Sequence, residues 1–211
     1  MFDGKNSSFG RGSFMKIIAL DIETSGLEPE CSLLTAFFQI VDFNPETKAL
    51  TLAKDYENGS LYLRIKHDLY HVQPQAMSVN KIDLVEHHKI SEYKQTAGQK
   101  LYRFLKNWSK DGANKLVPFG QGVKGDLPKI YAQLLGRLTW EQFCSYRTLD
   151  CGVVARFYQM QGKIPMELSC GLESLVDYFC PDVISETKSG LHDAQVDTLL
   201  SIEVLRAELR I

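Results

Sequence analysis

The chain has 211 residues and a mass of 23.9 kDa, which suits one well-packed domain and is short for two. Its hydrophobic content of 44%, charged content of 24% and net charge of −2 are ordinary for a globular protein. No apolar run approaches the ~20 residues that a membrane helix needs, and the first residues lack the pattern of a signal peptide. These properties exclude a membrane-spanning protein, and we expect a soluble, cytoplasmic one.

Residues 1–14 are rich in glycine and serine and lack periodicity, so we expect a flexible leader followed by a single domain over residues 15–211. The five cysteines are odd in number and form no C-x-x-C pair. This argues against a disulfide framework and against a structural zinc site. The cysteines are Cys31, Cys144, Cys151, Cys170 and Cys180.

The first third of the domain has the character of β-structure. Apolar and alternating patterns predict strands over residues 16–22, 33–42, 49–55 and 61–65. The sequence Asn-Pro-Glu-Thr at 44–47 predicts a turn between the second and third of these. We therefore expect an antiparallel meander at the beginning of the domain.

Helical periodicity dominates the rest of the chain and alternates with shorter strands. Helical segments are predicted over residues 74–80, 91–108, 127–138, 153–161, 172–179 and 193–209, with strands over 115–119 and 145–149. Helices that alternate with strands are typical of parallel crossovers. The predicted fold class is α/β, with a five-stranded mixed sheet flanked by α-helices.

Two acidic residues end the first predicted strand. Asp21 and Glu23 are separated by one residue, so on a strand they point to the same side. Like charges side by side at the end of a buried strand repel each other unless a cation lies between them, and hard divalent ions prefer carboxylate oxygen. Alone, this pair is also common as a solvated surface feature.

Two further acids and one histidine lie in a suitable context. Asp126 follows a predicted strand and a glycine-rich turn, at the start of a helix, where an aspartate is also a common N-cap. Asp197 lies in the last helix, where the ordinary alternative is a solvated surface acid. Five residues of helix turn ~500°, so His192 can serve the same site as Asp197 only from the loop before that helix. Asp193 is the predicted N-cap there.

Together these residues resemble the DEDDh branch of the DnaQ-like 3′–5′ exonucleases, of the RNase H-like superfamily. The first motif matches Asp21-Ile22-Glu23-Thr24-Ser25-Gly26-Leu27, and the third, H-x-A-x-x-D, matches His192-Asp193-Ala194-Gln195-Val196-Asp197. The second, usually G-H-N-x-x-F-D, is matched only by Gly120 and Asp126. The resemblance extends from residue 16 to residue 209.

The resemblance implies a two-metal phosphodiester hydrolase. It implies two Mg²⁺ ions, for which Mn²⁺ can substitute, held by Asp21, Glu23, Asp126 and Asp197, with His192 as the general base. The product would be a nucleoside 5′-monophosphate from a 3′ end. The implied contacts to the terminal nucleotide are Thr24, Gly26, Leu27, Asn80 and Ile82, with ordinary core packing as the alternative for the two apolar residues. The candidate phosphate contacts are Lys81, Lys124 and Lys129, with a solvated side chain as the alternative.

The implied partner is the 3′ end of a nucleic acid, preferably single-stranded, with DNA favoured and RNA possible. Neutralising four carboxylates would change the net charge from −2 to +2, which suits transient handling of a strand end. A polymerase or replication partner would have to act in trans. The alternatives are a catalytically silent module of the same fold that binds nucleic acid or a polymerase, and a phosphoesterase acting on small nucleotides.

Overall fold

A computed structural model describes residues 14–53, 59–183 and 192–211 of the chain. Nearly all of the predicted leader and the end of the predicted strand at 49–55 lie outside the described residues. Within them, the central sheet has seven strands in the order β5-β4-β2-β1-β6-β7, with β3 paired to β2. The strands are β1 (Met15–Thr24), β2 (Leu33–Asn44), β3 (Ala49–Leu52), β4 (Ser60–Lys66), β5 (Glu92–Tyr93), β6 (Val117–Gly120) and β7 (Leu149–Asp150).

The sheet is mixed, as predicted. β1 pairs antiparallel with β2 on one side and parallel with β6 on the other, so β1 is a central strand. β2 in turn pairs antiparallel with β3 and β4, while β6 pairs parallel with β7. The α/β fold with a mixed sheet is thus confirmed. The described sheet has seven strands where five were expected. β5 was not predicted because two residues are too few to give a periodic pattern, and β7 lies at the end of the segment predicted over 145–149.

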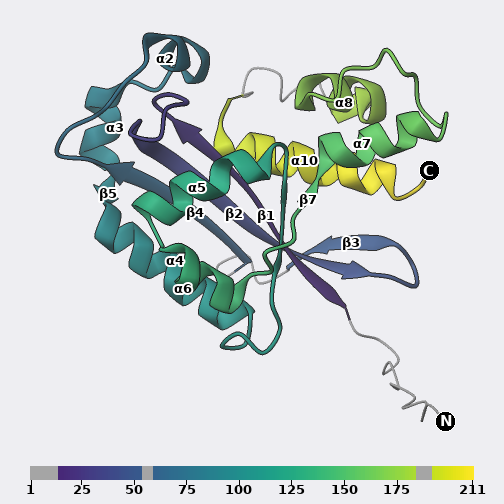
Figure 1. The fold of residues 1–211 in the computed structure, drawn as a ribbon, viewed down its shortest axis with the longest axis horizontal. Helices are drawn as coiled ribbons and strands as arrows, with labels where there is room; N and C mark the ends of the chain where they lie inside the picture. Colours follow the sequence, from purple (N-terminus) through teal and green to yellow (C-terminus); the bar gives the residue numbers. More distant parts are fainter. Residues whose placement is uncertain (1–13, 54–58, 184–191) are drawn as a thin grey trace, which may run out of the picture.

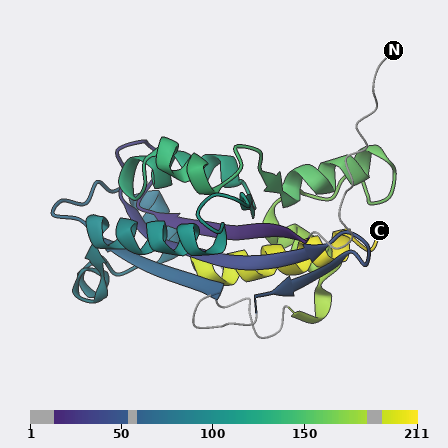
Figure 2. The same ribbon diagram turned by 90° about the horizontal axis from the view of Figure 1, so that it is seen from below.

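Helices cover both faces of the sheet, as Figures 1 and 2 show. On one face lie α4 (Lys94–Trp108), α5 (Val123–Gln133) and α6 (Arg137–Phe143), and on the other α7 (Cys151–Met160), α8 (Leu172–Phe179) and α10 (Ala194–Glu208). The short helices α2 (Pro74–Asn80) and α3 (Leu84–Ile90) connect β4 to β5, and η1 (Pro181–Val183) follows α8. Among the described helices, none is long and apolar enough to cross a membrane.

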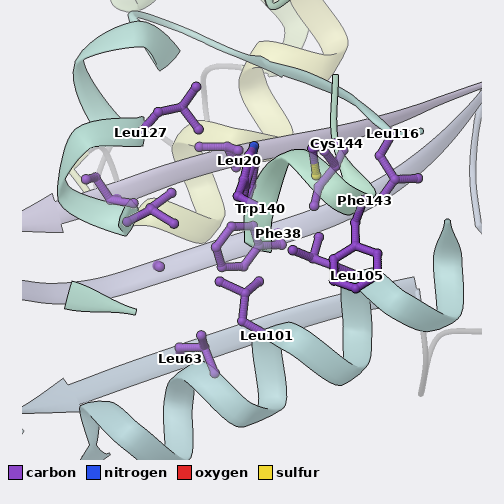
Figure 3. Close-up of a cluster of buried hydrophobic side chains, with 14 of the residues drawn as sticks. Leu20, Phe38, Leu63, Leu101, Leu105, Leu116, Leu127, Trp140, Phe143 and Cys144 are labelled. Atoms are coloured by element: carbon purple, nitrogen blue, oxygen red, sulfur yellow. The ribbon is translucent and has the colours of Figure 1, made fainter. Parts of the chain in front are cut away.

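The alternation of side chains along β1 divides the core into two clusters. Ile18, Leu20 and Ile22 belong to the cluster under α4, α5 and α6, where Trp140 and Phe38 are the largest buried side chains (Figure 3). Ile17 and Ala19 belong to the cluster under α7, α8 and α10. Residues 21 and 23 continue the second series, so β1 directs them to the face that α10 covers.

Several predicted boundaries differ from the structure. The helix expected over 127–138 is two helices: α5 begins four residues earlier at Val123, and α6 begins at Arg137. Ser91 was the expected start of a helix but is the C-cap of α3, and its hydroxyl donates to the carbonyl of His87. A serine beside a helix end can satisfy either a donor or an acceptor of the backbone, so the residue alone does not identify which end it caps.

Glu208, the last residue of α10, is fully buried, and neither carboxylate oxygen has a hydrogen-bond partner among the described residues. Burial, with a smaller contribution from the charge of Asp150, raises the pKa of Glu208 to about 8. A carboxyl whose pKa is higher in the folded than in the unfolded state stabilises the fold at low pH. That stabilisation is lost as the pH rises from the unfolded value toward 8.

We therefore expect Glu208→Gln to be more stable than the wild type above pH 8, by at least about 1 kcal/mol, and to lose this advantage at pH 5. Urea unfolding of both proteins at pH 5, 7 and 9 measures the difference. The exposed Glu167→Gln is the control and should show no such trend. A pH-independent difference for Glu208→Gln would contradict the assignment.

Candidate active site

Three carboxylates converge at the end of β1. Asp21 and Glu23 point from β1 to the face covered by α10, and Asp197 lies in the first turn of that helix. One oxygen from each of the three lies within 4.8 Å of the others. The pair at residues 21 and 23 is therefore joined by Asp197 as the motif spacing predicts, and the alternative of a solvated helix-surface acid is wrong for Asp197.

Burial and mutual repulsion make these carboxylates hard to ionise. Burial, followed by the charges of Asp126, Glu23 and Asp197, raises the pKa of Asp21 well above its ordinary value. Burial and the charges of Asp197, Asp193 and Asp126 raise the pKa of Glu23 to about 8. Burial raises the pKa of Asp197 to about 6, although the backbone N–H of His192 opposes this rise. Such a cluster is stabilised by protons or by a cation.

Asp126 approaches the cluster from α5, on the other side of β1. It is the fourth residue of that helix, whose N-cap is Gly122 in the left-handed conformation (φ 72°). The alternative that Asp126 is itself the N-cap is therefore wrong. Its Oδ2 is buried without a hydrogen-bond partner among the described residues, and burial, with the charge of Asp150, raises its pKa to about 7. Asp126 lies outside the three-carboxylate cluster but close enough to raise the pKa of Asp21 and Glu23.

The glycine-rich turn before Asp126 is fixed by contacts from distant parts of the chain. Asp150 accepts a hydrogen bond from the Gly122 N–H through Oδ2 (2.8 Å) and caps α7 through Oδ1. The Gln121 side chain donates to the carbonyl of Cys170 (2.9 Å). Gly120 must be glycine because an added Cβ would lie 2.5 Å from the carbonyl oxygen of Leu20 on β1. These contacts hold α5 against the end of β1.

His192 lies in the turn before α10, off the helix, as predicted. Its backbone has φ 71°, and its N–H donates to Asp197 Oδ2 (3.3 Å). The side chain is exposed and lines the same cavity as Glu23. Asp193 is the N-cap of α10, and its Oδ1 accepts from the N–H groups of Gln195 and Val196. The adjoining residues 184–191 lie outside the described residues.

Leu27 lies in the loop after β1, where its side chain is exposed and its backbone N–H is hydrogen-bonded. Leu27 is 91% exposed, and its N–H donates to Gln73 Oε1 (2.8 Å). A Cβ at Gly26 would lie 2.5 Å from Cys31 Sγ and 2.6 Å from the same Gln73 oxygen, so a larger residue fits there only if these side chains move. Thr24 donates its hydroxyl to the carbonyl of Gly26 (2.9 Å). Leu27 is thus an exposed apolar side chain three residues beyond β1, in a loop held by hydrogen bonds.

Lys129 supports this loop from below. Its ammonium group donates to the carbonyls of Glu28 and Cys31, and the side chain is buried. Gln133, one turn later on α5, donates to the Cys31 carbonyl and accepts from the Leu33 N–H. The expectation that Lys129 contacts phosphate is therefore replaced by a structural role. Lys124, on the same helix, is exposed.

Asn80 and Ile82 lie at the end of α2, next to the end of β1. The Asn80 amide donates to the carbonyl of Thr24 (3.0 Å) and accepts from the Ile82 N–H (3.1 Å), so it ties the end of α2 to β1. Asn80, Lys81 and Ile82 line a cavity of about 410 Å³ that reaches Glu23 and His192. The sequence had suggested Asn80, Lys81 and Ile82 as site residues. No local sequence pattern predicted the hydrogen bonds that Gln73, Lys129 and Asp150 make.

The donor set fits a hard divalent cation. All the converging side chains offer carboxylate oxygen, which Mg²⁺ and Mn²⁺ prefer. Two of the oxygens, Asp126 Oδ2 and Asp197 Oδ1, are buried without a hydrogen-bond partner among the described residues. A cation would satisfy both the free oxygens and the uncompensated charge. The five cysteines are free, as predicted, and take no part in this cluster.

Comparisons with solved structures locate the fold. E. coli exonuclease I in complex with a dT13 oligonucleotide matches with a TM-score of 0.64 and 17% identity, over 91% of this chain and 40% of that one. Cell-death related nuclease 4 matches with a TM-score of 0.64 and 11% identity, over 92% and 63% of the two chains. Exonuclease I from Methylocaldum szegediense gives 0.62 and 15%, over 92% and 40%. This chain has the fold of these exonucleases.

The likeness is one of fold and not of close sequence. No protein-family model matches the chain, and the curated proteins contain no match to it. The chain spans about two fifths of the length of the exonuclease I structures it matches. The assignment of the site residues therefore depends on the geometry of this structure.

We expect Asp21→Asn to stabilise the metal-free protein, because an amide removes the most buried charge from the cluster. The gain should be larger at pH 8 than at pH 5, since carboxyls with raised pKa values lose stability as the pH rises. Thermal unfolding with and without Mn²⁺ measures both effects. Mn²⁺ should raise the Tm of the wild type and of the exposed control Asp182→Asn, but not that of Asp21→Asn. A metal-induced shift retained in Asp21→Asn would contradict the site.

We expect Lys129→Met to keep the apolar stem of the side chain but release the loop after β1. The loss of its hydrogen bonds should lower stability by about 1–3 kcal/mol. Amide hydrogen exchange over residues 25–33 should become faster. Lys124→Met, on the same helix but exposed, is the matched control and should leave both unchanged. Equal effects of the two substitutions would argue against the supporting role of Lys129.

Proposed function

We propose that this chain is a metal-dependent 3′–5′ exonuclease that releases nucleoside 5′-monophosphates from single-stranded nucleic acid, with DNA favoured. The observation that carries the proposal is the convergence of Asp21, Glu23 and Asp197 within 4.8 Å, with His192 beside them. The fold shared with exonuclease I and cell-death related nuclease 4 supports it. So does the single-stranded oligonucleotide named in one of those structures.

Asp21, Glu23 and Asp197 would hold one divalent cation, and Asp126 would share a second with Asp21. When bound, such ions polarise the scissile phosphate and lower the pKa of an attacking water. One solved structure with this fold is described as the zinc-bound form of an exonuclease I–DNA complex, which agrees with a divalent-metal site of this kind. We favour Mg²⁺, with Mn²⁺ as a substitute, because every donor is a carboxylate.

The remaining residues supply proton transfer and positioning. His192 accepts the proton of the attacking water and, being exposed, can return it to solvent. Leu27 and Ile82 face the base of the terminal nucleotide from two sides, while Gly26 lets the chain pass close to it. The side chains of Thr24 and Asn80 donate hydrogen bonds to the backbone carbonyls of Gly26 and Thr24, and these bonds hold the loop in place. A polymerase or replication partner would act with this chain in trans.

The test is release of mononucleotide from a 3′-labelled single strand in the presence of Mg²⁺. The wild type should release the label as its first product, and EDTA should abolish release. His192→Ala should reduce kcat by about 10²–10⁴-fold because it removes a general base. His88→Ala, an exposed histidine that pairs with the Tyr70 hydroxyl, is the matched control and should keep full activity.

Matched DNA and RNA strands, and dinucleotides, identify the substrate. Faster shortening of DNA than of RNA supports the favoured substrate, and turnover of dinucleotides alone would indicate a phosphoesterase of small nucleotides. If the wild type releases no mononucleotide with Mg²⁺ or Mn²⁺, the proposal is wrong. If it also binds oligonucleotide tightly, the chain is a silent binding module.

A further inference from the structure

Tyr62 on β4 is tied to the loop that carries His192. Its hydroxyl donates to Asp193 Oδ2 (3.1 Å), across 131 residues of sequence. Both residues line the cavity that also contains Glu23 and His192. This hydrogen bond links the strand side of the cavity to the start of α10.

The same carboxylate fixes the helix itself. Asp193 Oδ1 accepts from the N–H groups of Gln195 (2.9 Å) and Val196 (3.3 Å), while Oδ2 accepts from Tyr62. One residue earlier, His192 has φ 71°, a left-handed conformation that is unfavourable for a non-glycine residue. Contacts on both sides must maintain this conformation. On one side, Asp197 accepts a hydrogen bond from the His192 N–H. On the other, the Tyr62 hydroxyl holds the neighbouring residue, Asp193.

Tyr62 is well placed to hold that contact. Its ring meets the ring of Phe37 on β2 edge-on, with centroids 5.9 Å apart, and the Arg64 guanidinium lies over its face at 4.3 Å. Burial, with the charge of Asp193, raises the pKa of Tyr62 to about 12, so its hydroxyl remains a donor throughout the neutral range. The Tyr62 ring is thus held by residues of the sheet, while its hydroxyl bonds to the loop that carries His192.

We propose that Tyr62 is a positioning residue, which acts through Asp193 to fix His192 in the orientation that faces the carboxylate cluster. The inference rests on the proposed function, since positioning matters only if His192 takes part in the reaction. It goes beyond that function by giving a role to a residue on β4 that lies in none of the three motifs.

The test is Tyr62→Phe, which removes only the hydroxyl. We expect kcat to fall by about tenfold while KM changes less than about twofold, because the substrate-facing residues are untouched. The matched control is Tyr158→Phe, whose hydroxyl donates to the Glu208 carbonyl (2.9 Å) at the far end of α10 and whose ring also lies beside a cation, Lys163. It should keep wild-type kcat.

A second substitution separates positioning from other roles. In the His192→Ala background, Tyr62→Phe should cause no further loss, since a residue that acts through His192 has nothing left to position. Losses that multiply would overturn the inference. So would a rise in KM with unchanged kcat, which would indicate direct contact with the substrate, or an equal loss in Tyr158→Phe, which would indicate general destabilisation.

One measurement judges the inference independently of activity. Amide exchange at His192, Gln195 and Val196, followed by NMR, should become at least about fivefold faster in Tyr62→Phe and stay unchanged in Tyr158→Phe. If the wild type shows no exonuclease activity, the proposed function fails. Unchanged exchange in Tyr62→Phe would overturn the positioning role even in an active enzyme.

Discussion

The repulsion among half-buried carboxylates at the end of β1 is the constraint on which the rest of the site depends. Asp21 and Glu23 continue a strand whose residues 17–20 are buried in the two cores. Their position is therefore set by apolar packing several residues away, and the site cannot relax by moving the strand. The folded protein must tolerate the charge until protons or cations compensate it. Sites that bind metal commonly show this conflict between stability and function.

Each element that brings a further charge to this place is anchored by contacts of its own. α10 carries Asp197 and packs through Leu200 and Val204 into the second core, while α5 carries Asp126 and packs through Val123 and Ile130. The two helices lie on opposite faces of the sheet (Figure 2). Carboxylates from both faces can meet beside the last residues of β1, past the end of β6, where the neighbouring strand no longer separates the two faces. The location of the site thus follows from the layer order of the fold.

Local patterns predicted those parts of the structure that depend on local geometry. The alternation along β1 placed Asp21 and Glu23 on one side, and helix geometry placed His192 off α10 with Asp193 as its cap. The start of α5 was missed because its N-cap is a glycine in the left-handed conformation, Gly122, and not a polar side chain. The short strand β5 was missed because two residues show no period.

No sequence pattern predicted the contacts between distant segments of the chain. Lys129 reaches the carbonyl of Glu28 from 101 residues away and Gln73 reaches Leu27 from 46. In sequence, each is an ordinary polar residue with a solvated surface as its commonest environment. Only the assembled fold shows that they hold the loop after β1. Sequence reasoning therefore identified the groups that would perform the chemistry more completely than the groups that hold them in place.

The second motif shows what the fold must preserve and what it can exchange. The glycine-rich turn lacks the usual residues between Gly120 and Asp126, yet Asp126 reaches the carboxylates closely enough to raise their pKa values. Gly120 permits the close approach to β1, and Asp150 fixes Gly122 from the neighbouring strand. Contacts from β1 and β7 thus hold Asp126 close to Asp21, although the turn before it lacks the residues usual in this motif.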